Sequence, residues 1–174
     1  MKGAAVTSAD LLGDAFGRVS GIVSRAVRGL GSEQLSMRVD DESNSIAWLT
    51  WHLTRIQDDH IAGVAGTEQV YTSGNWADRF ALPLDLSDTG FGHSSEEVAS
   101  VRVESGELLT GYHDAAFQQT VRFVEPLSDS DLARVVDESY DPPVTLGVRL
   151  VSVISDNLQH AGQAAFVRGI VTRK

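Results

Sequence analysis

Two ionisable side chains stand alone in an apolar stretch near the C-terminal end of the chain. Asp156 and His160 are the only ionisable residues between Leu150 and Phe166. Their spacing of four residues puts them on one face of a helix, about one turn apart. A buried carboxylate needs compensation, and a metal ion or a protonated histidine is the usual partner. The pair therefore predicts either part of a metal site or a local hydrogen bond or weak ion pair.

A second histidine lies on the apolar face of an earlier helical segment. His52 follows Leu49 by three residues and precedes Ile56 by four, which is helical spacing. If this face packs against the C-terminal helix, His52, Asp156 and His160 converge. Two imidazoles and one carboxylate would leave a coordination position open for water or substrate, and helix bundles build metal sites in this way. The alternative is that His52 is a core residue whose hydrogen bonds are satisfied without a metal.

Several other residues are candidates for a substrate or thiol pocket. Arg168, near the end of the C-terminal helix, could reach an anionic ligand, although a contact with a helix end is the alternative. His93 precedes the third expected helix and could serve only as a cap or loop contact. Trp76 could line the mouth of a pocket or simply pack. Asp59 and His60 could line a pocket or lie at a solvated helix end.

The composition excludes several classes of site. The 174 residues include no cysteine, and 24 acidic against 14 basic side chains give a formal charge of −10. Without cysteine there is no disulfide, zinc finger, iron–sulfur cluster or thiol nucleophile, so His, Asp and Glu must hold any metal. The acidic balance argues against a nucleic-acid partner, which requires a basic surface. The sequence contains no phosphate loop, dinucleotide fingerprint or serine-hydrolase motif.

Four segments with helical periodicity predict an all-α fold. They run approximately over residues 8–30, 43–64, 94–123 and 145–170. The last is apolar nearly all round, so we expect it to be buried on several sides. Four helices of this length are typical of a four-helix bundle, here as one domain over residues 1–174.

The connections between these helices differ in length. Residues 66–93 lack periodicity, and so long a loop usually serves a function or covers something. We expect it to shape the substrate pocket. In the link 127–143 we expect a turn of helix at 128–134 and a short extended piece at 134–136. The N-terminal residues 1–10 contain no apolar run of signal-peptide length, and no stretch of about 20 residues lacks charge, so we expect a cytoplasmic protein without a membrane partner.

Three motifs resemble those of the DinB-like superfamily. Its members are four-helix-bundle metalloproteins that include bacterial thiol S-transferases and the mycothiol-dependent maleylpyruvate isomerase. The three motifs are IAWLTWHL at 46–53, DNLQHAGQ at 156–163 and GFGHSSEEV at 90–98, the last resembling the mycothiol-linked branch. The resemblance covers most of the chain and implies a bundle with a long crossover connection between its second and third helices. The usual triad of the family is three histidines. Asp156 takes one of these positions, which is closer to the isomerase pattern.

The resemblance implies that His52, Asp156 and His160 hold a divalent metal, with Zn²⁺ favoured and Ni²⁺ or another divalent ion as alternatives. It also implies a homodimer that transfers a low-molecular-weight thiol to an electrophile, a detoxification reaction. Only Lys2 and Lys174 among the 14 basic residues are lysine, a bias typical of GC-rich genomes. This bias favours mycothiol over bacillithiol as the cosubstrate.

Two other functions remain open from the residues. The first is a non-catalytic, stress-linked bundle whose metal only stabilises the fold. The second is metal-assisted hydrolysis through a bound hydroxide, for which Asp59 and His60 are the best general bases that the sequence offers. A thiol requirement separates transfer from hydrolysis, and loss of folding in a metal-ligand variant favours the structural role.

Overall fold

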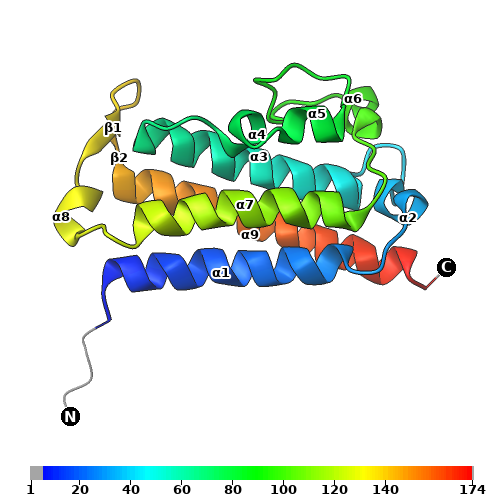
Figure 1. The fold of residues 1–174 in the computed structure, drawn as a ribbon, viewed down its shortest axis with the longest axis horizontal. Coiled ribbons are helices and arrows are strands. Elements are labelled where there is room, and N and C mark those ends of the chain that lie inside the picture. The colour runs from blue at the N-terminus through cyan, green and yellow to red at the C-terminus, as the bar shows by residue number, and fades with distance from the viewer. Residues whose placement is uncertain (1–5, 174) are drawn as a thin grey trace, which may run out of the picture.

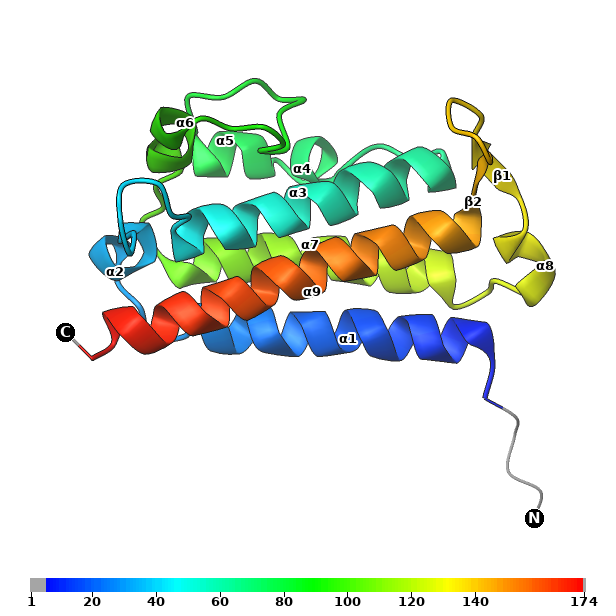
Figure 2. The same cartoon turned by 180° about the vertical axis from the view of Figure 1, so that it is seen from behind.

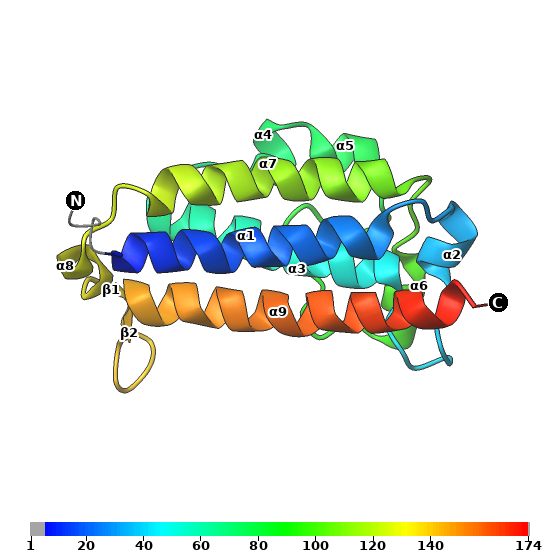
Figure 3. The same ribbon diagram turned by 90° about the horizontal axis from the view of Figure 1, so that it is seen from below.

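Four long helices form the bundle that the periodicity predicts (Figure 1). The computed structural model describes residues 6–173; residues 1–5 of the N-terminal stretch discussed above, and residue 174, lie outside this range. α3 packs against both α7 and α9, and α1 packs against the same two helices from the opposite side (Figure 3). No helix in the described range is both long and apolar enough to cross a membrane. The four helices are α1 (Ser8–Val27), α3 (Ile46–Ala65), α7 (Gly106–Val124) and α9 (Leu146–Val171).

Short elements connect the long helices. α4, α5 and the loop that follows them lie over α3, whereas α8 and a small antiparallel hairpin lie at one end of the bundle (Figures 1 and 2). The predicted helical turn and extended piece of the last link correspond to α8 and β1. The short elements are α2 (Ser32–Ser36), α4 (Val70–Ser73), α5 (Trp76–Phe80), α6 (Ser95–Ser100), α8 (Asp129–Leu132), β1 (Val135–Asp137) and β2 (Val144–Thr145).

The start of α3 shows how local side chains set the position of the site. Ser45 caps the helix, because its hydroxyl accepts a hydrogen bond from the Trp48 backbone N–H at 3.1 Å. A start at Ser43 was expected. That prediction is wrong, because the Ser43 hydroxyl is used in the preceding turn, where it donates to Asp40 Oδ1 at 2.7 Å.

The third predicted helix is interrupted. α6 ends at Ser100 and α7 begins at Gly106, so a single helix over residues 94–123 is wrong. Val101 and Val103 in the gap are both buried, which an extended backbone allows for side chains two residues apart. Gly106 then passes so close to α1 that an added Cβ would lie 2.9 Å from the Val27 carbonyl oxygen.

The central helix of the structure is α3 and not α9. The crossover covers the outer side of α3, so most of its side chains are buried. α9 contacts mainly α1 and α3, and its remaining side faces solvent (Figure 2). The expectation that α9 is buried on several sides is therefore wrong. Its exposed apolar residues are Val148, Val151, Leu158 and Phe166.

A buried histidine in the α3–α7 interface makes stability depend on pH. The Thr54 hydroxyl donates to the Thr50 carbonyl, so it accepts from His113 Nδ1–H at 3.1 Å. Burial lowers the pKa of His113 to about 4, so the folded state keeps this ring neutral. Below the ordinary pKa of 6.5 the unfolded chain binds a proton that the folded chain does not, and stability falls as the pH falls towards 4.

For His113 alone, we expect the free energy of unfolding to be about 2 kcal/mol lower at pH 5 than at pH 7. Urea titrations at both pH values measure the difference. In a His113→Leu variant the drop should shrink by that amount, whatever the variant's stability at pH 7. An unchanged drop would contradict a neutral buried ring.

Candidate metal centre

The three predicted ligands meet between α3 and α9. His52, Asp156 and His160 each offer one ligand atom, and these atoms all lie within 4.8 Å of one another. The two imidazole rings pack edge to face, with centroids 4.7 Å apart. His52 is buried and the other two are half-buried. The structure therefore brings together side chains that lie about 100 residues apart in the sequence.

Backbone carbonyls orient both imidazoles. His52 Nδ1 lies 2.5 Å from the Thr89 carbonyl oxygen, and His160 Nδ1 lies 2.9 Å from that of Asp156. Because a carbonyl only accepts, the proton of each neutral ring is on Nδ1. Each Nε2 lone pair is then free, which is the usual arrangement of metal-binding histidines.

One carboxylate oxygen of Asp156 has no hydrogen-bonding partner among the described residues. Asp156 Oδ2 is buried, forms no hydrogen bond with any described residue, and lies 3.4 Å from His160 Nδ1. Burial lowers the pKa of His160, but the attraction of the nearby Asp156 carboxylate and the bond to the Asp156 backbone carbonyl outweigh burial, so the net shift is upward. Burial also lowers the pKa of His52. A divalent cation would satisfy the free oxygen, and a set of two nitrogens and one oxygen suits Zn²⁺.

A hydrogen-bonded relay packs against the His52 ring. Trp48 stacks on His52 with centroids 4.6 Å apart, and its indole N–H donates to His93 Nδ1 at 3.0 Å. His93 Nε2–H then donates to the Asp88 carboxylate at 2.9 Å, which also accepts from the Gly90 N–H. Both nitrogens of His93 are therefore occupied, and its visible role is to hold Trp48 against the ligand.

A fully buried arginine anchors the crossover that supplies this relay. Arg55 lies on α3, and its side chain is 0% exposed. Its guanidinium donates to the carbonyls of Leu86 and Asp88, each at 3.0 Å, and to Gln69 Oε1 at 2.7 Å. Both carbonyls lie within three residues of Thr89, whose own carbonyl orients the candidate histidine ligand of α3. Arg55 thus positions the ligand through the backbone of the loop.

A buried carboxylate completes this anchor. Asp58 accepts hydrogen bonds from the backbone N–H groups of Val70 and Tyr71 and from the Tyr112 hydroxyl, all at 2.8 Å. Even so, burial raises its pKa. Arg55 and Asp58 are not among the residues that the sequence predicts for the site. The sequence did contain a signal for them, namely two opposite charges three residues apart in a helix whose other residues are mostly apolar.

Gly90 allows the loop to approach the histidine on α3. Its φ is +89°, and an added Cβ would lie 2.8 Å from His52 Nδ1 and 3.1 Å from the Trp51 ring. We expect Gly90→Ala to lower the free energy of unfolding by about 2–3 kcal/mol and to weaken zinc binding at least about tenfold. Gly92→Ala is the matched control, because Gly92 has a φ of +77° with nothing within 4 Å. Equal zinc affinities in the two variants would contradict this role of Gly90.

The structure places the other two pocket candidates in different contacts. Arg168 donates to the Ala26 carbonyl at 3.1 Å, near the end of α1. Trp76 is buried against Tyr112, and the guanidinium of Arg79 lies over its ring, 3.8 Å from the centroid. No described contact joins either residue to the three-ligand cluster.

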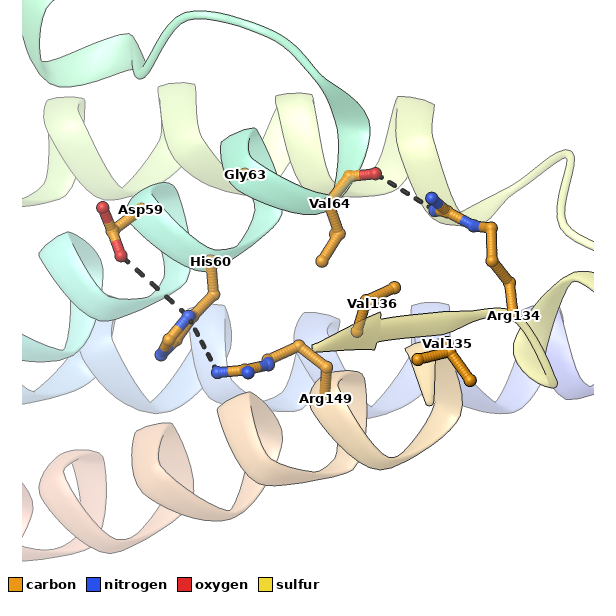
Figure 4. Close-up of a pocket in the computed structure, with 8 residues that line it drawn as sticks. All are labelled: Asp59, His60, Gly63, Val64, Arg134, Val135, Val136 and Arg149. Carbon is orange, nitrogen blue, oxygen red and sulfur yellow. Dashed lines mark hydrogen bonds and ion pairs between the residues drawn. The ribbon is translucent and has the colours of Figure 1, made fainter. Parts of the chain in front are cut away.

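Two hollows flank the cluster along α3 and α9. The larger, of about 450 Å³, includes His60 and Arg149, each two turns from a ligand on the same helix (Figure 4). The smaller, of about 240 Å³, includes Leu49 and Gln163, each one turn from a ligand on the opposite side. No residue of the 66–93 loop lines either hollow, so the loop acts on His52 and does not shape these cavities.

A known protein family matches nearly the whole chain. The model of the Mycothiol-S-transferase family matches residues 12–173, a range that includes all three candidate ligands. The chain belongs to the mycothiol-S-transferase family. This confirms the resemblance to DinB-like proteins, of which this family is a member.

A solved structure shares the fold of this mycothiol-S-transferase family member. The "conserved protein of locus from Enterococcus faecalis" has a TM-score of 0.90 and 29% sequence identity. The alignment covers 98% of the present chain and 100% of the other. Among the curated proteins compared, none matches the chain.

Proposed function

We propose that this protein is a metal-dependent S-transferase that conjugates mycothiol to an electrophile in the cytoplasm, in a detoxification role. The observation that carries the proposal is a buried Asp156 Oδ2 beside two imidazoles whose Nε2 atoms, like that oxygen, have no partner within residues 6–173. Membership of the mycothiol-S-transferase family supports the choice of thiol. Zn²⁺ is the ion that we propose for the site, because its usual ligands are of these types.

Each residue of the site would have a distinct role in the proposed reaction. A bound divalent ion lowers the pKa of a coordinated thiol, so that the thiolate nucleophile exists at neutral pH. His52, Asp156 and His160 would hold the ion, and Thr89 keeps the His52 ring in the orientation that frees Nε2. Trp48 covers one face of that ring and excludes water from it. Since the chain has no cysteine, the thiol must come from the cosubstrate.

The smaller hollow is our candidate for the electrophile. It begins one turn from the metal ligands, and its lining is largely apolar, with Leu49, Phe166 and Val167 from the two helices. Such a surface favours an apolar electrophile, since burial of carbon in an apolar hollow is the main driving force available there.

A rate measurement tests the proposed function. Zinc-loaded protein is mixed with mycothiol and monobromobimane, whose fluorescence reports thioether formation. We expect a rate above the uncatalysed reaction that requires both zinc and mycothiol. No enhancement with a fully zinc-loaded protein would favour the non-catalytic bundle. Zinc-dependent cleavage of an ester without any thiol would favour the hydrolase.

We also propose that the protein is a homodimer, joined through the open face of α9 with a contribution from α1. The apolar side chains Leu11, Val148 and Val151 are each more than half exposed, which favours a partner surface. Light scattering after gel filtration gives the mass. We expect twice 18.7 kDa for the wild type and a monomer for Val151→Glu. A monomeric wild type would refute the dimer.

A further inference from the structure

The larger hollow is lined by both polar and apolar residues (Figure 4). It lies where β1 meets α3 and α9, and its volume is about 450 Å³. The apolar part of the lining consists of Gly63 and three valines from α3 and β1. Asp59 and His60 of α3 and Arg149 of α9 form one polar group, whereas Arg134, just before β1, lies beside the valines and reaches the Val64 carbonyl (Figure 4).

The charges around this hollow balance. Arg149 Nη2 donates to the Asp137 carboxylate at 2.8 Å, and its Nη1 lies 3.4 Å from His60 Nδ1. Burial and the neighbouring arginine lower the pKa of His60, so its ring is neutral and Nε2 carries the proton. Arg134 donates to the Val64 carbonyl at 3.1 Å and has no carboxylate within ion-pair distance among the described residues. The two arginines are therefore matched in number by two carboxylates, those of Asp59 and Asp137.

This balance favours an uncharged ligand with many hydroxyl groups. A site for an anion would carry excess positive charge, whereas the lining of this hollow offers guanidinium and imidazole donors as well as carboxylate acceptors. A hydroxyl both donates and accepts, so a polyol can use all of these groups. The carbon faces of its rings can pack against the three valines.

The distance between the hollow and the proposed metal site limits which small molecule could occupy both. On each helix the hollow begins two turns from a ligand, which is about 11 Å. Mycothiol joins its cysteine by an amide to glucosamine and then to inositol, so its thiol and its cyclitol ring can span a similar length. A thiol near the metal ligands could therefore have its sugar part in this hollow.

We propose that the hollow between β1, α3 and α9 binds the hydroxyl-rich glucosaminyl-inositol part of the thiol cosubstrate. Arg134, Arg149 and His60 donate to its hydroxyls, Asp59 accepts from them, and Val136 packs against a ring face. The inference rests on the proposed function for the place of the sulfur. The occupancy of the hollow can be tested without any reaction.

Calorimetry with glucosaminyl-inositol, which has no thiol, tests the hollow directly. We expect saturable binding to zinc-loaded wild-type protein. Arg134→Gln should weaken this binding about tenfold, because it removes one or two hydrogen bonds to the sugar. Arg134 is exposed, so this change should leave the fold intact. Arg122→Gln, an exposed arginine on α7, is the control and should bind like the wild type. No binding to the wild type, or equal binding by both variants, would overturn the proposal.

Filling the hollow provides a second, kinetic test. An added Cβ on Gly63 meets nothing within 4 Å, so Gly63→Leu should occupy the cavity without disturbing the helix. We expect the KM for mycothiol to rise at least about tenfold while kcat/KM for N-acetylcysteine, which lacks the sugar part, stays within about twofold. Gly13→Leu on α1 is the matched control, because Gly13 also has open space.

The outcomes separate this inference from the proposed function. Equal losses for both thiols, or no loss for mycothiol, would reject the sugar site while leaving the transferase intact. Binding of glucosaminyl-inositol by a protein with no transfer activity would keep the sugar site and reject the proposed reaction.

Discussion

Replacing His160 with alanine is expected to reduce bound zinc from about one equivalent per chain to almost none. With its Nε2 gone, only His52 and Asp156 remain, and two ligands hold zinc poorly compared with three. The thiol-transfer rate should fall at least about 100-fold with it, because the thiol would lose the cation that lowers its pKa. His52→Ala should have the same effect from the other helix. Elemental analysis of protein purified without chelator or nickel affinity measures the zinc.

The control for this prediction is His60→Ala, a histidine two turns along α3 that is not part of the cluster. It should keep its equivalent of zinc. Circular dichroism should show similar helicity in all three variants. If the wild type binds no metal even after reconstitution, Asp156 and His160 are a buried polar pair, and the proposed reaction is wrong. If both ligand variants retain zinc, the metal binds at other residues, and the proposed site is wrong.

Replacing Arg55 with methionine is expected to lower the free energy of unfolding by about 3–5 kcal/mol. Methionine fills a similar space but leaves the carbonyls of Leu86 and Asp88 without their donor, and it leaves Asp58 without a nearby cation. Burial already raises the pKa of Asp58, so loss of the cation makes its charged form still more costly. Urea titration measures the change.

The same variant should also weaken zinc binding, because Arg55 holds the loop that carries the Thr89 carbonyl. A competition titration with a zinc chelator should show a loss of about tenfold or more. Arg122→Met on the exposed side of α7 should change stability by less than about 0.5 kcal/mol and leave zinc affinity unchanged. An Arg55 variant that is destabilised but binds zinc normally would confine Arg55 to a structural role.

Local spacing in the sequence was enough to predict the bundle and the grouping of the candidate ligands. A helix repeats every 3.6 residues, so the apolar stripes of α1, α3 and α9 can be read without a structure. Asp156 and His160 are four residues apart, and their helix places them together wherever it packs. Only the pairing of α3 with α9 had to be assumed for His52, and the structure confirms that pairing.

The contacts that hold the site could not be read in this way, because they join backbone atoms of a loop to side chains of a distant helix. A carbonyl such as that of Thr89 is present at every position of the chain, so nothing in the sequence marks it as the partner of His52. Gly90 is required by a contact across the fold, and the buried position of Arg55 depends on where residues 86–88 pass. Helical periodicity describes each element alone, whereas these positions follow from the packing of the crossover on α3.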